Sequence, residues 1–273
     1  MKHLCIYHKN CADGFGAALS VKRFLDRDKQ GEDQEYLAAH YGDEAPDVTG
    51  KHVYIVDFSY PREVLINMKE QAASIVVLDH HKTAQANLDG LTFCHFNMNM
   101  SGAVMAWEYF NTCQDFPDLI NYIEDRDLWR WQLPQSKEYS AGLQLNSMDF
   151  DVWEKFLDND NTQHLINDGK TVLAYQNLQI KRVIAQDFEM ISIAGYEVPC
   201  INTTQLISEI GNELSKGHPF AAMYFETDNK RVYSLRSASD GIDVSAIAKQ
   251  YGGGGHFHAA GFSVDKPKVD LSL

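Results

Sequence analysis

The chain has 273 residues, of which 44% are hydrophobic and 23% charged, values typical of a globular protein with one large domain or two modest ones. Its net charge of −14 argues against coating of long nucleic acid, which requires many basic side chains to replace counterions. No apolar run approaches the roughly 18 residues of a membrane span, and the start is too polar for a signal peptide. We therefore expect a cytoplasmic protein with no membrane partner.

The cysteines are scattered along the chain and none forms a C-x-x-C pair. They are Cys5, Cys11, Cys94, Cys113 and Cys200. An odd number without paired spacing argues against a disulfide framework and against a zinc knuckle. Four of them are expected to be small buried hydrophobic residues or inert surface thiols. Cys11 is the exception because of the residues around it.

The first 110 residues alternate between strand and helix patterns. Strands are expected at residues 3–7, 36–41, 53–56, 74–78 and 91–96. Helices are expected at residues 14–25, after Pro61, which suits a first helical turn, and after Ser101, which suits an N-cap. Strand-helix-strand alternation predicts a parallel α/β sheet.

The remaining chain divides into a helical stretch and a second α/β pattern. From about residue 115 to about residue 187 the apolar spacing is mostly helical, with a long helix near residues 172–184. A short strand near residue 191, a helix at 206–214, strands near 220–225 and 231–235 and a helix near 244–251 follow. We therefore predict a larger domain at 1–185 and a smaller α/β domain at 190–273.

Acidic and imidazole side chains follow three of the expected strands. These groups are His8 with Asp13, then Asp57, then the triplet Asp79, His80 and His81. Because parallel strands end at one edge of a sheet, these side chains are expected to converge. Carboxylates mixed with imidazoles suit Mn²⁺, Fe²⁺ or Zn²⁺ better than Ca²⁺. Two such ions bridged by a carboxylate form the usual clamp for hydrolysis of phosphate esters.

An ordered set of motifs resembles the DHH phosphoesterase superfamily with its DHHA1-type substrate-binding domain. The motifs are HKNCADG at residues 8–14, Asp57, the Asp79-His80-His81 triplet, EDRDLW at 124–129 and GGGGHFHAAG at 252–261. Each motif alone is a weak signal, but the set runs in order over nearly the whole chain.

The resemblance implies a phosphoesterase with two Mn²⁺ ions. Asp57 would bridge the ions and His8 would bind the first. The second ion would be bound by Asp13, His80 and Asp127. Asp127 is preferred to Asp125 because it matches the family's aspartate that is followed two residues later by tryptophan.

The same resemblance implies roles for the two remaining residues of the triplet. His81 would lie near the scissile phosphate or the metal-activated water. Asp79 would orient the histidines, as carboxylates commonly do for metal-bound imidazoles. We therefore expect His81 and Asp79 to be the catalytic side chains.

The first motif departs from the family. Many members have Asp-x-Asp-Gly, whereas this chain has Cys11-Ala12-Asp13-Gly14. The first aspartate is replaced by Cys11 or, with a shifted loop, by Asn10. A thiolate is a soft ligand and an amide oxygen a weak neutral one, so the first ion would be bound differently, bound loosely or brought by the substrate.

The glycine run near the end of the chain allows two interpretations. Four successive glycines can form an anion-binding nest, or they can end a helix and continue as a loop. The resemblance implies that the stretch binds the phosphate or terminal nucleotide of the substrate through Gly253, Gly254, Gly255 and His256. Arg236 matches a family arginine and its guanidinium suits phosphate.

Together these expectations describe a metal-dependent phosphodiesterase that acts on short linear oligoribonucleotides or dinucleotides, for example products of cyclic-dinucleotide breakdown. The family also contains cyclic-nucleotide phosphodiesterases, adenosine bisphosphate phosphatases and polyphosphate hydrolases, which the sequence does not separate. The alternative of another class is a nucleotide-binding sensor with impaired catalysis. Trp129 and Trp131 could stack on a base, although packing in the core or between domains is the favoured interpretation.

Overall fold

The computed structural model describes residues 2–27, 33–112, 114–186 and 188–266. Cys113, Asp187 and the end of the expected second domain, residues 267–273, lie outside this description. The chain divides into unit 1, Met1–Leu173, and unit 2, Ala174–Leu273, with the division inside the long helix α8 (Thr162–Ile184). Within the described ranges, no helix is both long enough and apolar enough to cross a membrane.

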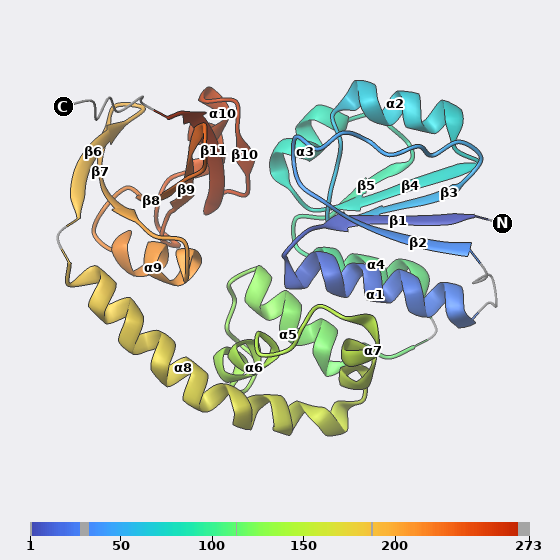
Figure 1. Ribbon diagram of the computed structural model, residues 1–273, viewed down its shortest axis with the longest axis horizontal. Helices are drawn as coiled ribbons and strands as arrows, with labels where there is room; N and C mark the ends of the chain where they lie inside the picture. Colours follow the sequence, from blue (N-terminus) through green and yellow to red (C-terminus); the bar gives the residue numbers. More distant parts are fainter. Residues whose placement is uncertain (1, 28–32, 113, 187, 267–273) are drawn as a thin grey trace. The chain divides into compact units, whose positions relative to one another are not determined.

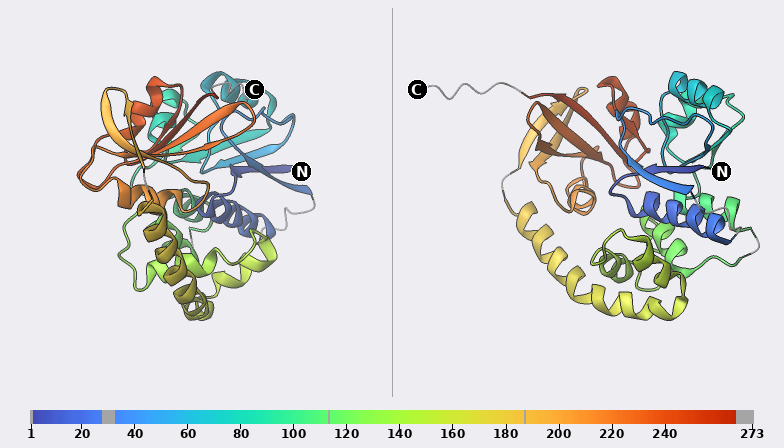
Figure 2. Two further views of the ribbon diagram at one scale, coloured as in Figure 1. Left: turned by 60° about the vertical axis from the view of Figure 1, so that its left-hand side comes forward. Right: turned by 45° about the vertical axis from the view of Figure 1, so that its right-hand side comes forward.

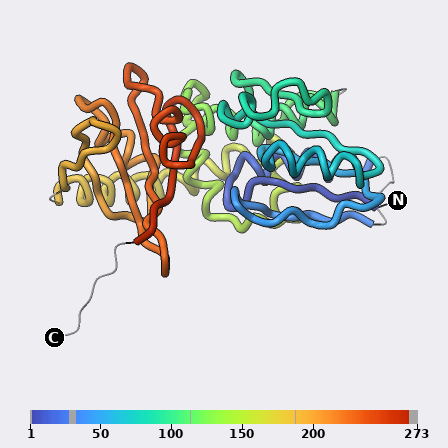
Figure 3. The backbone as a smooth tube through the Cα atoms, turned by 90° about the horizontal axis from the view of Figure 1, so that it is seen from above, coloured from blue at the N-terminus to red at the C-terminus, as the bar shows by residue number. Residues whose placement is uncertain are grey.

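Unit 1 is built on a five-stranded sheet in the order β2-β1-β3-β4-β5 (Figure 1). The strands are β1 (His3–His8), β2 (Gln34–Ala39), β3 (His52–Val56), β4 (Ser74–Asp79) and β5 (Cys94–Phe96). All neighbours are parallel, which confirms the predicted parallel sheet. Figure 3 shows β1 and β2 side by side. Because β2 and β3 lie on opposite sides of β1, the carboxyl ends of β1 and β3 form a switch point, where open α/β sheets bind ligands.

Two helices cover each face of this sheet (Figure 1). They are α1 (Ala12–Arg27) with α4 (Gly102–Phe110) on one face, and α2 (Arg62–Gln71) with α3 (Lys82–Leu88) on the other. On the first face Val21 and Leu25 pack near Val56, and each fully buried side chain of this kind contributes about 1.5–3 kcal/mol. Ser101 caps α4 as predicted, since its side chain accepts a hydrogen bond from the Val104 amide.

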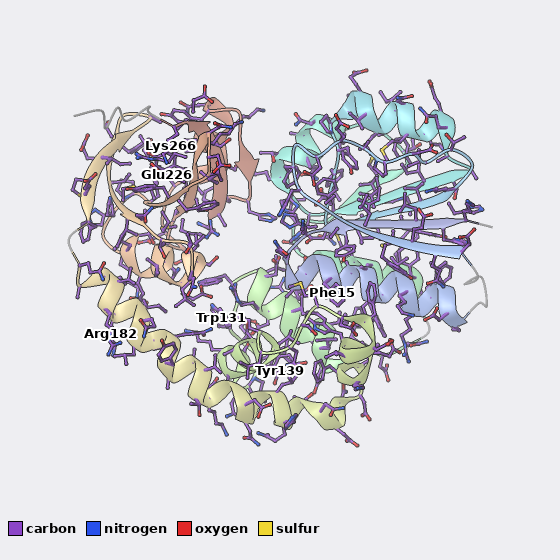
Figure 4. The ribbon with its side chains drawn as sticks, in the orientation of Figure 1. Phe15, Trp131, Tyr139, Arg182, Glu226 and Lys266 are labelled. Carbon is purple, nitrogen blue, oxygen red and sulfur yellow. The ribbon has the colours of Figure 1, made fainter. Side chains whose placement is uncertain are left out.

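The helical part of unit 1 packs on α1 and α4. It consists of α5 (Asp118–Asp127), α6 (Ser136–Leu143), α7 (Phe150–Trp153), the 3₁₀ helices η2 (Glu154–Leu157) and η3 (Asn159–Asn161), and the start of α8. A second apolar core joins Phe15 of α1 to Tyr139 and Trp153 of these helices, and Figure 4 labels Phe15 and Tyr139. This packing fixes α5 against the sheet domain and thereby positions Asp127, its last residue.

Unit 2 is a six-stranded mixed sheet in the order β10-β11-β9-β8-β7-β6, and Figure 2 shows it from two directions. Its strands are β6 (Glu189–Ile193), β7 (Tyr196–Asn202), β8 (Ala221–Glu226), β9 (Lys230–Arg236), β10 (Gly254–Gly255) and β11 (Ala259–Asp265). Apolar side chains from α10 (Val244–Gln250) cover one face. Those from α9 (Ile207–Leu214) and the end of α8 cover the other.

Strands β7 and β11 are absent from the sequence-based expectations, as is the two-residue strand β10 within the glycine run. Pro199 interrupts the apolar pattern of β7, and β11 begins with two alanines and a glycine, which are depleted in strands. Both segments extend because neighbouring strands pair with them: β7 lies between β6 and β8, and β11 between β9 and β10.

Candidate metal centre

Three neighbouring strands of unit 1 present the predicted side chains at the switch-point edge of the sheet. His8 ends β1, Asp57 directly follows β3, and Asp79 ends β4. Asp57 is 1% exposed and has a left-handed backbone with a φ of 53°. Such a conformation is uncommon for a residue other than glycine and is found preferentially at functional sites.

His80 is the meeting point of three carboxylates. Its Nε2 atom lies 3.1 Å from Asp57 Oδ1, 3.3 Å from Asp13 Oδ2 and 3.5 Å from Asp127 Oδ2. The side chains of His80 and Asp13 are each 1% exposed. Several carboxylates buried around one imidazole repel one another unless a cation lies among them. The arrangement therefore has the composition of a divalent metal site.

A second group of donors shares Asp57. Single donor atoms of His8, Cys11 and Asp57 lie within 4.8 Å of one another. His8 Nδ1 is 3.8 Å from Asp57 Oδ2, whereas the other oxygen of the same carboxylate faces His80. Asp57 thus stands between the two groups, as a carboxylate that bridges two metal ions must.

Asp13 is held by the first turn of α4. Its two carboxylate oxygens accept hydrogen bonds from Gly102 N at 2.6 Å and Ala103 N at 2.8 Å, and the start of a helix favours an anion. A Cβ atom at Gly102 would lie 2.5 Å from Asp57 Cβ, so the close approach of α4 requires glycine. Burial alone would raise the pKa of Asp13, but hydrogen bonds from His80 and the Ala103 amide lower this pKa to about 2.

The pKa values of the two other carboxyl groups around His80 are raised rather than lowered. Burial and the neighbouring Asp13 charge raise the pKa of Asp57 to about 8 and that of Asp127 to about 6. Burial opposes the charged form of His80, yet hydrogen bonds to Asp13 and Asp57 raise the pKa of this imidazole overall. The protons held in this way are those that a divalent ion displaces on binding. The donor set therefore fits two divalent ions.

Asp79 fixes the ring of His81 beside this cluster. The Asp79 carboxylate is fully buried and accepts hydrogen bonds from the amides of His80 at 2.7 Å and His81 at 3.1 Å. It also lies 2.6 Å from His81 Nδ1 and accepts a hydrogen bond from Ser59 Oγ. Burial opposes the charged forms of both groups, but His81 holds the pKa of the Asp79 carboxyl below its usual range, and Asp79 in turn raises the pKa of His81.

The sequence analysis missed two groups of this site, Ser59 and the α4 amides. Ser59 lies two residues after Asp57, and this proximity to a candidate ligand is the signal that could have found it. The α4 amides carried no such signal, because they reach Asp13 across 89 and 90 positions of the chain.

The two aspartates near the end of α5 have different surroundings. Asp127 reaches His80, whereas Asp125 is buried and accepts hydrogen bonds from Gln132 N at 2.8 Å and Leu133 N at 3.3 Å. Asp125 therefore closes the turn after α5.

Trp129 and Trp131 follow Asp127 on that turn, and both have a left-handed backbone. Their rings lie 5.0 Å apart, and the Arg126 guanidinium is 4.8 Å from the first and 5.6 Å from the second (Figure 4 labels Trp131). Both tryptophans are half-buried, and neither belongs to the buried cores of the described residues.

Unit 2 brings Arg236 close to part of the glycine run. In the sheet, Ala259 of β11 pairs with Arg236 of β9, and the next residue pairs with Gly255 of β10. Arg236 donates hydrogen bonds to Ser208 Oγ at 3.0 Å and to the Leu235 carbonyl at 2.8 Å. The guanidinium is therefore held in place on the strand that neighbours β11.

The glycine run itself has two parts. The amides of Gly252 and Gly253 donate to the Lys249 and Ala248 carbonyls at the end of α10, at 3.1 Å and 2.9 Å. Gly254 and Gly255 form β10. His256 follows this strand, and its amide donates to the Ala259 carbonyl at 2.8 Å.

Fold and site together define an α/β protein with a carboxylate–imidazole centre at the switch point of a parallel sheet. Residues 195–271 match the family model of the DHHA1 domain. The fold is similar to that of RecJ from Thermus thermophilus in complex with Mn²⁺, with a TM-score of 0.53 at 16% identity over 97% of this chain and 50% of that one. The chain therefore carries a DHHA1 domain, and as a whole it resembles the DHH superfamily of phosphoesterases.

Two curated proteins align with almost the whole chain. It is 30% identical to the uncharacterized protein R106 of Acanthamoeba polyphaga mimivirus, over 94% of this chain and 66% of that protein. It is 25% identical to the oligoribonuclease NrnB of Bacillus subtilis (strain 168), over 96% of this chain and 67% of that protein. The chain thus spans about two thirds of the length of these relatives.

Proposed function

We propose that this chain is a metal-dependent phosphodiesterase that hydrolyses short linear oligoribonucleotides or dinucleotides and uses two Mn²⁺ ions. The observation that carries the proposal is the meeting of two donor groups at Asp57, beside the Asp79–His81 pair. Similarity to the oligoribonuclease NrnB supports the substrate class. The net charge of −14 also favours a short substrate over a long polymer bound along a basic groove.

Each side chain has one task in this proposal. His8 and Asp57 hold the first ion, and Asp57 is shared with the second, which Asp13, His80 and Asp127 hold. When bound, the two ions supply positive charge and an activated water to the phosphodiester. The α4 amides keep Asp13 fixed, which sets the position of this ligand before the substrate arrives.

His81 is the proposed general acid. Asp79 holds the ring through Nδ1 and raises its pKa, so the imidazolium persists to higher pH than in a free histidine. A proton on Nε2 of this ring is then available for the oxygen that leaves phosphorus. Asp79 acts through His81 and is a positioning residue.

In unit 2, Arg236 and the segment Gly253–Gly254–Gly255–His256 are proposed to bind the substrate phosphate. A guanidinium held by Ser208 and a backbone carbonyl keeps its planar fork in a defined orientation, which suits a phosphate group. A cytoplasmic location is part of the same proposal, and free thiols at the four described cysteines are typical of a reducing compartment.

The test is a substrate panel with chelated protein reloaded with Mn²⁺. The panel contains 5′-phosphorylated dinucleotides, longer oligoribonucleotides, cyclic nucleotides, adenosine 3′,5′-bisphosphate and polyphosphate. Dinucleotides should give the highest kcat/KM. Asp57→Asn and Asp127→Asn should each lower kcat by about 100-fold or more. Loss of a residue that only supports a metal ligand costs up to about 100-fold, and loss of a ligand itself should cost at least as much. Asp160→Asn, which changes an exposed aspartate of unit 1, is the matched control and should leave the rate unchanged.

Each alternative has its own outcome in this panel. Turnover of polyphosphate alone would replace the proposal with a polyphosphate hydrolase. Nucleotide binding without turnover of any substrate would identify a sensor. Full activity of Asp57→Asn would show that the site has been assigned to the wrong residues.

A further inference from the structure

Cys11 occupies the place at which many DHH proteins have the first aspartate of the first motif. It directly precedes α1, and its carbonyl accepts a hydrogen bond from Phe15 N at 3.0 Å. Its Sγ atom belongs to the group with His8 and Asp57 whose donor atoms lie within 4.8 Å of one another. The neighbouring Asn10 is exposed and turns the chain with a φ of 55°, a conformation that asparagine tolerates.

The surroundings of Cys11 differ from those of the other described cysteines. Cys5 and Cys200 are members of hydrophobic cores, and Cys94 packs against one. Among the described residues, Cys11 belongs to none of these cores and has a buried carboxylate and an imidazole as neighbours instead. Packing therefore does not explain a cysteine at this position.

We propose that Cys11 binds the first metal ion as a thiolate, together with His8 and Asp57, and that it makes this site prefer a softer ion than the second site. On binding, the S–H bond breaks, a sulfur–metal bond forms and the proton leaves to water. A thiolate has the same charge as the aspartate it replaces but is a softer donor, which favours Zn²⁺, Co²⁺ or Fe²⁺. The second site, built from Asp13, His80 and Asp127, has only oxygen and nitrogen donors and suits Mn²⁺.

The position at the helix terminus supports this role. The amide of Gly14 hydrogen-bonds to the Cys11 sulfur at the start of the 16-residue helix α1, whereas burial and the charges of Asp57, Asp127 and Asp13 raise the pKa of this thiol well above its usual value. The thiolate therefore forms when a cation lies beside it and takes the place of the proton. Amides at a helix start stabilise a negative sulfur, as they do in other reactive or ligating cysteines. The inference rests on the proposed function only in requiring that the centre binds metal ions.

Absorption spectroscopy of the cobalt-loaded full chain tests the inference directly. Titration of chelated protein with Co²⁺ should produce a thiolate-to-cobalt charge-transfer band in the near ultraviolet. Cys11→Asp and Cys11→Ser should lose this band while their circular dichroism matches that of the wild type. Cys94→Ser, the control at a half-buried cysteine outside the cluster, should keep it. A band that persists in both Cys11 variants would overturn the proposal.

Competition between metal ions provides the second readout. The ratio of Zn²⁺ to Mn²⁺ affinity at the first site should fall by about tenfold or more in Cys11→Asp, because the variant replaces a soft thiolate donor with a hard carboxylate of the same charge, and a change of direct donor should exceed the smallest effects of outer-sphere partners. An unchanged ratio would overturn the proposed preference. Neither readout needs a substrate, so a protein that shows the band but hydrolyses nothing would support this inference and overturn the proposed function.

Discussion

Replacement of Asp57 with asparagine should stabilise the metal-free protein at alkaline pH and abolish its response to Mn²⁺. Burial and the Asp13 charge raise the pKa of Asp57 from 3.8 to about 8. At pH values between these two pKa values, the Asp57 carboxyl keeps its proton in the folded state and has released it in the unfolded state. Stability of the metal-free protein therefore falls as the pH rises through this window. Asparagine has nearly the same shape and no proton to lose, so this pH dependence disappears.

The size of the effect follows from the shift in pKa. A change of about 4 units at 1.36 kcal/mol each sets an upper limit of about 5 kcal/mol near pH 8. Part of the stability that Asp57→Asn gains is lost again, because the Asp57 carboxylate lies 3.1 Å from His80 Nε2 and helps to stabilise the His80 imidazolium. We therefore expect Asp57→Asn to gain about 2–4 kcal/mol at pH 8 and little near pH 4.

Urea unfolding in the presence of EDTA at several pH values measures this difference, and thermal melts with added Mn²⁺ measure the metal response. The wild type should gain melting temperature with Mn²⁺ because binding to the folded state stabilises it. Asp57→Asn should not. The reasoning is refuted if the variant is less stable than the wild type at pH 8 without metal, or if Mn²⁺ raises both melting temperatures equally.

Three further predictions concern the same centre. Mn²⁺ affinity, measured by calorimetry, should rise between pH 6 and pH 8. The raised pKa values of Asp57 and Asp127 mean that these carboxyls must lose their protons before they bind the ion. A Mn²⁺ affinity that does not change with pH would contradict this. Asp79→Asn should lower the pKa of His81 and so move the alkaline limb of the pH profile of kcat to lower pH. The variant should also lose about 3–5 kcal/mol of unfolding free energy in urea, because it breaks a buried charged pair. An alkaline limb that does not move would exclude His81 as the general acid. Gly102→Ala should cost about 1–3 kcal/mol and weaken Mn²⁺ binding, since the new Cβ meets Asp57; unchanged stability and affinity would show that α4 can move away.

The sequence alone predicted most of unit 1 because its signals are local. Runs of branched apolar residues predicted β3 and β4, and Ser101 predicted the start of α4 through a hydrogen bond within one helical turn. The alternation of strands and helices then predicted a parallel sheet. Since parallel strands end at one edge, the convergence of Asp57 and Asp79 followed from order along the chain.

Unit 2 was predicted less completely because its sheet depends on pairing between distant segments. The short glycine strand β10 and the alanine-rich start of β11 have little intrinsic preference for extended structure. Their hydrogen-bonding partners, supplied by the rest of the sheet, decide their conformation.

The sequence by itself determined which chemical groups this protein carries at its strand ends, because apolar periodicity and motif order are written into neighbouring residues. Only the tertiary structure decided how those groups are used. It showed that Asp13 accepts hydrogen bonds from amides 89 and 90 residues away, that Asp125 closes the turn after α5, and that Cys11 lies beside His8 and Asp57. These contacts depend on how α1, α4 and α5 pack on the sheet, and no local pattern encodes that packing.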